Sequence, residues 1–564
     1  MKLNKILFYM FCGTFLFLGS CQNEDFVNST NKTEGPLSLT AIFTSGKYID
    51  KEAIVYTIPD SSVTDFVIPV PWYYPEDSMT TTQQYMTSMK VVAGLNPNCK
   101  LSPILGILDL TKKNPFTYTD EKGKSRSITI SGQMTKSDKC QILSFDLPSV
   151  GVSGVVDDNT KIISLVSADN IPETTASYIL SPHATISPDP TTTSLNYNDT
   201  VRFTVTANNG TTTAVYKAIK ALPTKLASGL RSGSQKALFS TDITNFGVTN
   251  AGAIHPTLAS IGSYVILDLG DGSTPVYLNK VSGSKVGSVA LGSADPSGCV
   301  TSDLNGNMLI SNYVQSGSTL KIYKTNSVTS TPTLYISYDD ELNLPMGSRI
   351  HVQGDLNSNA IIVATCDGPG SKDFVRWVVT NGVVGQPVHV TAGVTDSWNG
   401  FDGNAKVVSR SESTSDGYFL GYYDGGNDNV YYCNSSNTPT TNLSAVSNGS
   451  AWGYNNGCID TRDFNNAKFF VLYSIGYWPD WGLPATIYLY NVSSLSSFTG
   501  TVDQSKALIY STTESAYTSI GYAGDGRTGD VLMIPSSDGY KLDIYYVDNT
   551  SLGIGGLEFD CINK

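Results

Sequence analysis

The sequence predicts an all-β chain in which two immunoglobulin-like β-sandwich modules precede a C-terminal β-propeller. Three observations lead to this prediction: a segment that repeats through the C-terminal half, short alternating strands without helical periodicity before it, and the composition. The chain has 51 Gly and 32 Tyr, and only 15% of its residues are charged. Such an excess of turn-forming and β-favouring residues is typical of all-β proteins.

The repeat is clearest in two segments that both begin Gly-Cys. Residues 298–307 return, with one insertion, as residues 457–466, and looser copies lie at 355–359, 402–404 and 525–529. The copies are roughly 50 to 60 residues apart, which is the period of propeller blades. Most are followed by an apolar strand and then by an aromatic-rich strand. Such units bury both faces only when they stack around an axis.

This spacing predicts six blades, with seven as the alternative. The expected blades are residues 250–293, 298–338, 347–392, 398–446, 456–511 and 517–562.

A further similarity between two segments concerns how the ring of blades closes. Residues 236–240 resemble residues 506–511, which are expected to form the outer strand of the fifth blade. The first strand of the domain is therefore expected to complete the last blade, which protects sheet edges. Residues 557–561 compete for the same position.

The N-terminus has the pattern of a targeting segment. Lys2 and Lys5 precede an apolar run that ends at Leu18-Gly19-Ser20-Cys21. This tetrapeptide resembles the lipobox of bacterial lipoproteins, which implies cleavage before Cys21 and lipidation of its thiol. Gln22-Asn23-Glu24-Asp25 resembles the surface-export signal of Bacteroidota lipoproteins. We therefore expect a chain anchored to the outer membrane at the cell surface rather than one that spans it.

Changes in composition divide the chain into six parts. Residues 181–188 and 203–211 resemble small immunoglobulin-like modules of Bacteroidota surface lipoproteins, which usually act as spacers. The expected parts are the signal peptide (1–21), a flexible tether (22–36), two immunoglobulin-like modules (37–138 and 139–221), a linker (222–235) and the propeller (236–564).

An aromatic cluster, Trp72-Tyr73-Tyr74, lies between two prolines at the end of an expected strand. It could form a binding ledge, although an aromatic plug at a domain edge is the simpler interpretation.

Charge and cysteines narrow the classes of function. The net charge of -13 argues against a nucleic-acid partner, because phosphate binding requires a basic face. Beyond Cys12 and Cys21, seven scattered cysteines make a poor disulfide framework. Cys299 and Cys458 are expected to be small buried residues. The Asp and Asn of the repeats most simply stabilise turns, so no metal and no cofactor are predicted.

Aromatic residues gather in loops that blade topology places on one face of the propeller. Tryptophan in polar loops is costly to expose without a use, and an aromatic surface suits the apolar faces of sugar rings. Packing between blades is the alternative role. The predicted ligand-binding residues are Trp398, Trp452, Tyr454, Tyr477, Trp478, Asp480 and Trp481.

No motif identifies an enzyme. The chain lacks a nucleophile elbow, a zincin motif, a P-loop and the aspartate box of sialidases. A carboxylate pair for glycoside hydrolysis could be drawn from Asp396, Asp424, Asp428 and Asp480, but the sequence singles out none. A lone histidine in a strand, such as His351, is expected to be a satisfied core residue.

The lipobox, the acidic tetrapeptide and the order of modules resemble surface glycan-binding lipoproteins of Bacteroidota polysaccharide-uptake systems, many of them domains of unknown function. The resemblance implies non-catalytic capture of a polysaccharide or oligosaccharide for uptake, with a transporter complex as a partner. A propeller glycoside hydrolase or polysaccharide lyase is the first alternative, and a protein-binding adhesin or scaffold is the second.

Overall fold

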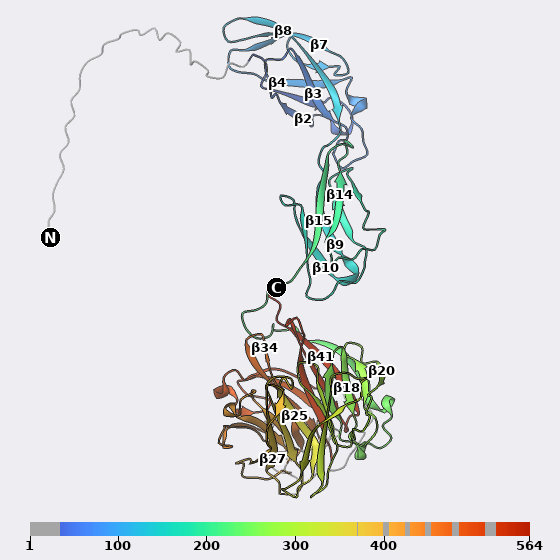
Figure 1. Ribbon diagram of the computed structural model, residues 1–564. Helices are drawn as coiled ribbons and strands as arrows, with labels where there is room; N and C mark the ends of the chain where they lie inside the picture. Colours follow the sequence, from blue (N-terminus) through green and yellow to red (C-terminus); the bar gives the residue numbers. More distant parts are fainter. Residues whose placement is uncertain are drawn as a thin grey trace, which may run out of the picture. The chain divides into compact units, whose positions relative to one another are not determined.

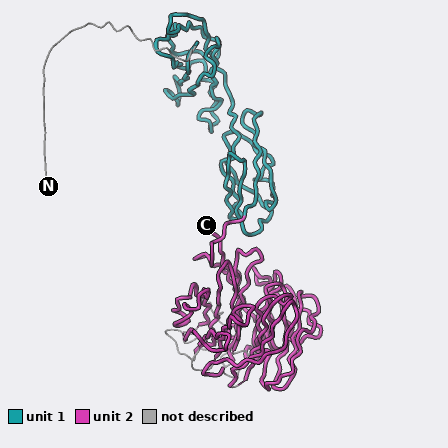
Figure 2. Tube along the Cα trace, turned by 60° about the vertical axis from the view of Figure 1, so that its left-hand side comes forward, with its two compact units in different colours: residues 1–221 teal, residues 222–564 magenta. Residues whose placement is uncertain are grey.

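The computed structural model describes residues 34–368, 370–398, 405–423, 429–445, 453–476, 484–513 and 526–563. The chain divides into two compact units, residues 1–221 and 222–564 (Figure 2). The all-β prediction is confirmed: the described residues contain strands and short 3₁₀ turns but no α-helix. The 3₁₀ turns include Gly46–Tyr48, Gln83–Tyr85, Pro148–Val150, Ile243–Phe246, Ala251–Ala253, Thr414–Asp416 and Leu495–Ser497.

The first part of unit 1 is a sandwich of two four-stranded sheets. One sheet has the order β2 (Glu52–Thr57), β1 (Ser38–Phe43), β4 (Met89–Gly94) and β6 (Ile107–Leu108). The other has the order β3 (Asp65–Pro71), β8 (Ser125–Thr135), β7 (Asn114–Thr119) and β5 (Lys100–Ser102). Buried residues alternate with half-buried or exposed ones along β1 and β3, as expected when one face of each sheet covers a shared core.

The second part of unit 1 differs from the two-sheet arrangement that the sequence predicts. Its strands form one sheet in the order β12 (Ser177–Leu180), β9 (Ile142–Leu147), β10 (Val152–Asp157), β11 (Ile162–Val166), β15 (Thr213–Ala221), β14 (Val201–Thr206) and β13 (Thr185–Ser187). Phe145 of β9 lies with its ring 5.3 Å from Phe203 of β14, although three strands separate them in the sheet. The sheet therefore curls over a single core.

The described residues of unit 2 form six sheets, each of four or five strands (Figure 1). The first sheet has the order β17 (Thr257–Ile261), β18 (Tyr264–Asp268), β19 (Val276–Asn279) and β20 (Lys285–Ser288). The second has the order β21 (Cys299–Ser302), β22 (Met308–Ser311), β23 (Thr319–Thr325) and β24 (Thr333–Asp339). The third has the order β25 (Met346–Gly354), β26 (Ala360–Cys366), β27 (Asp373–Thr380) and β28 (Val383–Val384), and β29 (Val388–Thr391) also pairs with β27.

The fourth sheet has the order β30 (Ala405–Ser409), β31 (Tyr418–Tyr422), β32 (Val430–Cys433), β33 (Pro439–Ser444) and β37 (Gly500–Thr501). The fifth has the order β34 (Tyr454–Phe464), β35 (Ala467–Gly476), β36 (Thr486–Asn491) and β38 (Leu508–Thr513). The last has the order β16 (Lys236–Asp242), β41 (Gly553–Asp560), β40 (Lys541–Asp548) and β39 (Gly529–Pro535).

The inner strands of the six sheets form a closed ring. Each of β17, β21, β25, β30, β34 and β39 contacts the next, and β39 contacts β17. These inner strands are buried along almost their whole length, whereas an outer strand such as β24 alternates between buried and exposed residues. The difference follows because neighbouring sheets cover both faces of an inner strand.

The predicted closure by the first strand is confirmed. β16 pairs antiparallel with β41, with Phe239 opposite Gly556, and is the outer strand of the last sheet. The competing segment, residues 557–561, begins in β41 itself, so both segments belong to this sheet.

The strands of each sheet in unit 2 end on two opposite sides, which we call the turn edge and the loop edge. At the turn edge, hairpins join first to second strands, as between Phe464 and Ala467. The linker lies along this edge: Leu226 donates its N–H to Cys561 O at 2.8 Å, and Gly229 donates to Asn465 O at 2.8 Å. At the loop edge, second strands end and first strands begin, as at the pair Tyr454 and Gly476.

Candidate functional site

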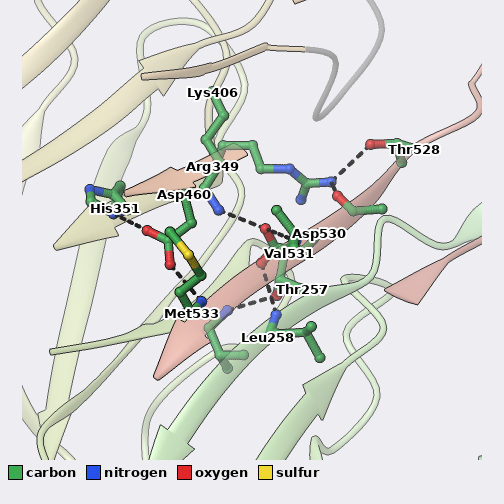
Figure 3. A network of polar contacts seen from close by, with 12 residues as sticks. Thr257, Leu258, Arg349, His351, Lys406, Asp460, Thr528, Asp530, Val531 and Met533 are labelled. Carbon is green, nitrogen blue, oxygen red and sulfur yellow. Dashed lines mark hydrogen bonds and ion pairs between the residues drawn. The ribbon is translucent and has the colours of Figure 1, made fainter. Parts of the chain in front are cut away.

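Buried polar and charged side chains from inner strands that are far apart in the sequence contact one another within the ring (Figure 3). The exposed fraction of each of these side chains is at most 5%. The central network consists of Arg349, His351, Lys406, Asp460, Arg462 and Asp530. Charges this deeply buried are stable only when they are paired and hydrogen-bonded.

Asp460 of β34 connects three sheets. Its Oδ1 accepts from His351 Nε2 of β25 at 3.1 Å and lies 3.2 Å from the guanidinium of Arg462. Its Oδ2 accepts the N–H of Met533, in β39, at 2.8 Å. Burial alone would raise the pKa of Asp460, but the Arg462 charge and the His351 bond outweigh it and lower the pKa to about 2. The carboxylate is therefore ionised at neutral pH.

Asp530 of β39 repeats this geometry one sheet further round. Its Oδ1 accepts from Lys406 Nζ at 2.6 Å, and its Oδ2 accepts the N–H of Leu258, in β17, at 3.0 Å. In both aspartates Oδ1 also accepts the N–H of the next residue, Thr461 or Val531. Each carboxylate thus joins two neighbouring sheets through a backbone N–H and a third sheet through a cation or histidine.

His351 is neutral in this environment. Burial lowers its pKa to about 4, although the bond to Asp460 acts in the opposite direction. The ionised Asp460 can only accept, so the proton is on Nε2. In that tautomer the Arg462 contact with Nε2 at 3.3 Å is not a hydrogen bond. The prediction of a structural histidine fits these contacts.

The side chain of Arg349, in β25, reaches the start of β39 and donates hydrogen bonds to neutral acceptors there. Its guanidinium donates to Thr528 Oγ1 and to Gly529 O, each at 2.9 Å, from a side chain that is 1% exposed. The buried network therefore links five of the six sheets, through residues of β25, β30, β34, β39 and β17, and both of its carboxylates are paired.

The turns at Asp303 and Asp355 are built as predicted, by carboxylates that bind the local backbone. Asp303 Oδ1 accepts from the N–H groups of Asn305 and Asn307 at 2.9 and 2.8 Å. Its Oδ2 also accepts the N–H of Leu356, in the turn of the next sheet, at 3.0 Å. Cys299 and Cys458 are buried, as predicted. Among the described residues, no cluster of His, Cys, Asp and Glu could hold a metal ion.

Two residues of the predicted aromatic surface are buried, and this part of the prediction is wrong. Trp398 is 1% exposed, and its indole N–H donates to Cys366 O at 2.8 Å. Tyr454 is 7% exposed and belongs to a core cluster that includes Tyr488 and Phe470. Neither ring offers a face to a ligand. Packing, the alternative that the sequence left open, is what they do.

The remaining predicted site residues, Trp452, Tyr477, Trp478, Asp480 and Trp481, lie outside the described residues, as does Cys21. The strands that border them are described. β34 begins and β35 ends at the loop edge, which is opposite the edge where the linker lies. Asp424 and Asp428 are also outside the described residues.

Most of the central network could not be recognised from the sequence. Arg349 and His351 alternate with the apolar Ile350 and Val352 in β25, and this pattern is also that of an ordinary half-exposed strand. Only the closure of the ring brings Lys406 beside Asp530, which is 124 residues away.

With this geometry in place, comparison with known families is informative. Residues 237–560, more than half of the chain, match the family described as a domain of unknown function, DUF8500. The chain belongs to the DUF8500 family. In this DUF8500 protein, residues 16–132 and 142–220 match two further domains of unknown function, DUF5018 and DUF8499. No curated protein matches the sequence significantly.

Solved structures resemble the DUF8500 protein only distantly. A DUF4623 family protein from Bacteroides eggerthii is 15% identical, covers 75% of this chain and 99% of its own, and has a TM-score of 0.43. An α-L-arabinanase from Penicillium chrysogenum complexed with arabinobiose is 10% identical, and the match covers 60% of this chain and 99% of the arabinanase, with a TM-score of 0.35. An exo-β-1,3-galactanase from Phanerochaete chrysosporium is 13% identical, and the match covers 56% of this chain and 78% of the galactanase, with a TM-score of 0.31. Scores this low carry neither an activity nor a ligand over to this chain.

The described residues include no helix that is long and apolar enough to cross a membrane.

Proposed function

We propose that the protein is a non-catalytic surface lipoprotein that captures an extracellular polysaccharide at the loop edge of a six-bladed β-propeller. Trp452, Trp478 and Trp481, with Tyr477 and Asp480, are the residues proposed to bind the glycan. Aromatic rings stack on the apolar faces of sugars, and carboxylates accept from their hydroxyl groups.

The observation that carries the proposal is the position of the strand ends that border these residues. β34 begins with Tyr454 paired to Gly476 at the end of β35, so both flanking segments leave the same edge of the same sheet. The linker contacts Cys561 and Asn465 at the opposite edge. A glycan at the loop edge would therefore meet the face of unit 2 that the linker leaves uncovered.

The burial of Trp398 and Tyr454 supports a more limited binding surface than the sequence predicts. Trp398 anchors the connection before β30 to Cys366 of β26, and Tyr454 fixes the start of β34 in the core. Both then serve as rigid supports beneath the loop edge. Binding sites built on rigid strands lose less conformational entropy when a ligand binds.

Anchoring and location are part of the same proposal. Cys21 would carry the lipid, residues 22–36 would form the tether, and residues 37–221 would separate the propeller from the outer membrane. A transporter complex would accept the captured chain.

The proposal is tested with the purified chain that begins at Gln22, on a panel of arabinan, xylan, galactan, β-1,3-glucan and starch. Retardation in glycan-containing gels measures binding, and a reducing-end assay on the same mixtures measures turnover. We expect retardation by at least one glycan without release of reducing ends. Release of reducing ends would replace capture with hydrolysis, and a failure to bind any glycan would reject a carbohydrate ligand.

A further inference from the structure

Unit 1 contains a surface pocket of about 490 Å³ that the proposal above does not use. It lies where the end of β3 and the end of β8 meet the β14–β15 turn. Its volume is within the range of small-ligand sites, about 300–1,000 Å³. The side chains that define it are Trp72, Tyr73, Glu76, Lys136, Asp138 and Asn208.

The aromatic cluster noted in the sequence divides into two roles. Tyr74 packs into the core, with its ring 4.7 Å from Phe43, and acts as the predicted plug. Trp72 and Tyr73 line the pocket and are half-buried. The first role explains why the segment is aromatic at Tyr74, but it does not explain the two rings that remain at the surface.

The backbone of Trp72 and the ring of Tyr73 are held in place before any ligand arrives. Trp72 donates its N–H to Thr135 O at 2.8 Å and accepts from Thr82 N at 3.0 Å, so its backbone is fixed on both sides. Tyr73 stacks on His183, with ring centroids 4.0 Å apart. The His183 ring is in turn held by a bond from Nε2 to Ser78 O at 2.9 Å.

The polar groups of the pocket include some that are not committed to other partners. Asn209 is occupied, because its side chain binds Thr211 and Thr212. In contrast, Asp138 and Asn208 make no side-chain hydrogen bond with any described residue. A pocket with fixed rings and free amide and carboxylate groups suits a ligand with one apolar face and several hydroxyl groups.

The charges of the pocket favour a neutral ligand. Glu76 is paired with Lys139 at 2.8 Å, and this bond lowers the pKa of Glu76. Lys136 lies over the Trp72 ring, with Nζ 5.2 Å from its centroid, and Asp138 carries the opposite charge nearby. The surface therefore has no excess of one sign that would select an anion or a cation.

We infer that this pocket is a second glycan-binding site, which holds a short stretch of a neutral polysaccharide by stacking on Trp72 and by hydrogen bonds to Asp138 and Asn208. The inference takes its ligand class from the proposed function but concerns a different unit of the chain. Two sites on one tethered chain would bind a long polysaccharide more tightly than either site alone.

The test is ¹⁹F NMR of the chain from Gln22 with all six tryptophans replaced biosynthetically by 5-fluorotryptophan. Trp72→Phe assigns one signal, and Trp452→Phe, Trp478→Phe and Trp481→Phe assign the loop-edge signals. Oligosaccharides cut from the same panel of polysaccharides are the probes. We expect the Trp72 signal to shift on titration, also in the Trp478→Ala/Trp481→Ala variant. In isothermal titration calorimetry, adding Trp72→Ala to the Trp478→Ala/Trp481→Ala variant should weaken the remaining binding by about ten- to a hundredfold, by analogy with other aromatic stacking.

A matched pair of acidic variants separates binding from folding. Asp138→Ala should weaken binding several-fold, whereas Asp77→Ala, an exposed neighbour outside the pocket, should leave it unchanged. Equal melting temperatures would show that neither change unfolds the module.

The outcomes also separate the two proposals. If only the loop-edge signals shift, the second site is rejected and the proposed function stands. If only Trp72 shifts, the second site stands and the loop edge is rejected as the binding surface. If neither responds to any probe, both are rejected.

Discussion

Two aspartates in the centre of the ring, Asp460 and Asp530, each combine the same three tasks. Each accepts a backbone N–H from the neighbouring sheet, accepts the N–H of its own successor and neutralises a buried cation or binds a histidine. The stability of unit 2 depends on every buried polar group keeping its partner. A buried group that loses its partner costs more free energy than the intact pair contributes.

Lys406→Met tests this directly. The substitution leaves the Asp530 carboxylate, which is 4% exposed, without its only cation within salt-bridge distance among the described residues. We expect the free energy of unfolding of unit 2 to fall by about 3–5 kcal/mol, measured by urea unfolding. Lys285→Met, at an exposed position in β20, is the control and should change it by less than about 0.5 kcal/mol. Equal effects of the two changes would contradict the role of the network.

His351 should make unit 2 sensitive to acid. Its pKa is about 4 in the folded chain and about 6.5 in the unfolded chain, so the unfolded state binds more protons between these values. The free energy of unfolding should therefore fall as the pH is lowered from 6.5 to 4, by on the order of 3 kcal/mol from this residue.

The measurement compares wild type with His351→Gln at pH 7 and pH 4. Asp543, whose pKa burial raises to about 6, titrates in the same range with the opposite sign, but it contributes equally to both chains. The wild type should lose more stability than the variant. Parallel pH profiles would mean that His351 is not held neutral by burial.

At the scale of the element, closure of the ring depends on one strand from the start of the domain. β16 is separated from its partner β41 by more than 300 residues and completes the last sheet. Phe239 of β16 packs against Tyr545, with ring centroids 6.2 Å apart, and lies so close to Gly283 that a Cβ there would meet its ring at 2.3 Å. The strand thus joins the last sheet to the first.

Phe239→Ala should therefore destabilise the whole of unit 2 and not only its edge. We expect a loss of about 3 kcal/mol with a single cooperative transition, measured by urea unfolding. Leu334→Ala, in the outer strand β24 where Leu334 is 54% exposed, is the matched control and should have little effect. A transition that splits into two after Phe239→Ala would instead mean that the last sheet unfolds independently.

The sequence predicted elements better than side-chain directions. The repeat located the sheets of unit 2 because the turn signal of Asp303 and its copies is local, and local chemistry can be read from one segment. The burial of Trp398 could not be predicted in this way. Its position before β30 is set by the sequence, but its direction depends on Cys366 O, a group in another strand of the preceding sheet.

At the scale of the whole molecule, the same limit applies to function. The segments proposed as lipobox, tether and linker are each continuous in the sequence, so the sequence alone supports a prediction of anchoring. The pocket of unit 1 is formed by residues from four separate segments, and the sequence pointed only to its aromatic part. Capture of a long glycan by both units, through a lipid-anchored chain, is the function that we propose to join these features.

The most direct test of that function is isothermal titration calorimetry of the chain from Gln22 with the glycan that binds best. Wild type is compared with the Trp478→Ala/Trp481→Ala variant. Each lost ring should remove on the order of 1–3 kcal/mol of binding free energy, so the variant should bind at least tenfold more weakly, with an unchanged melting temperature. Full affinity in the variant would contradict capture at the loop edge.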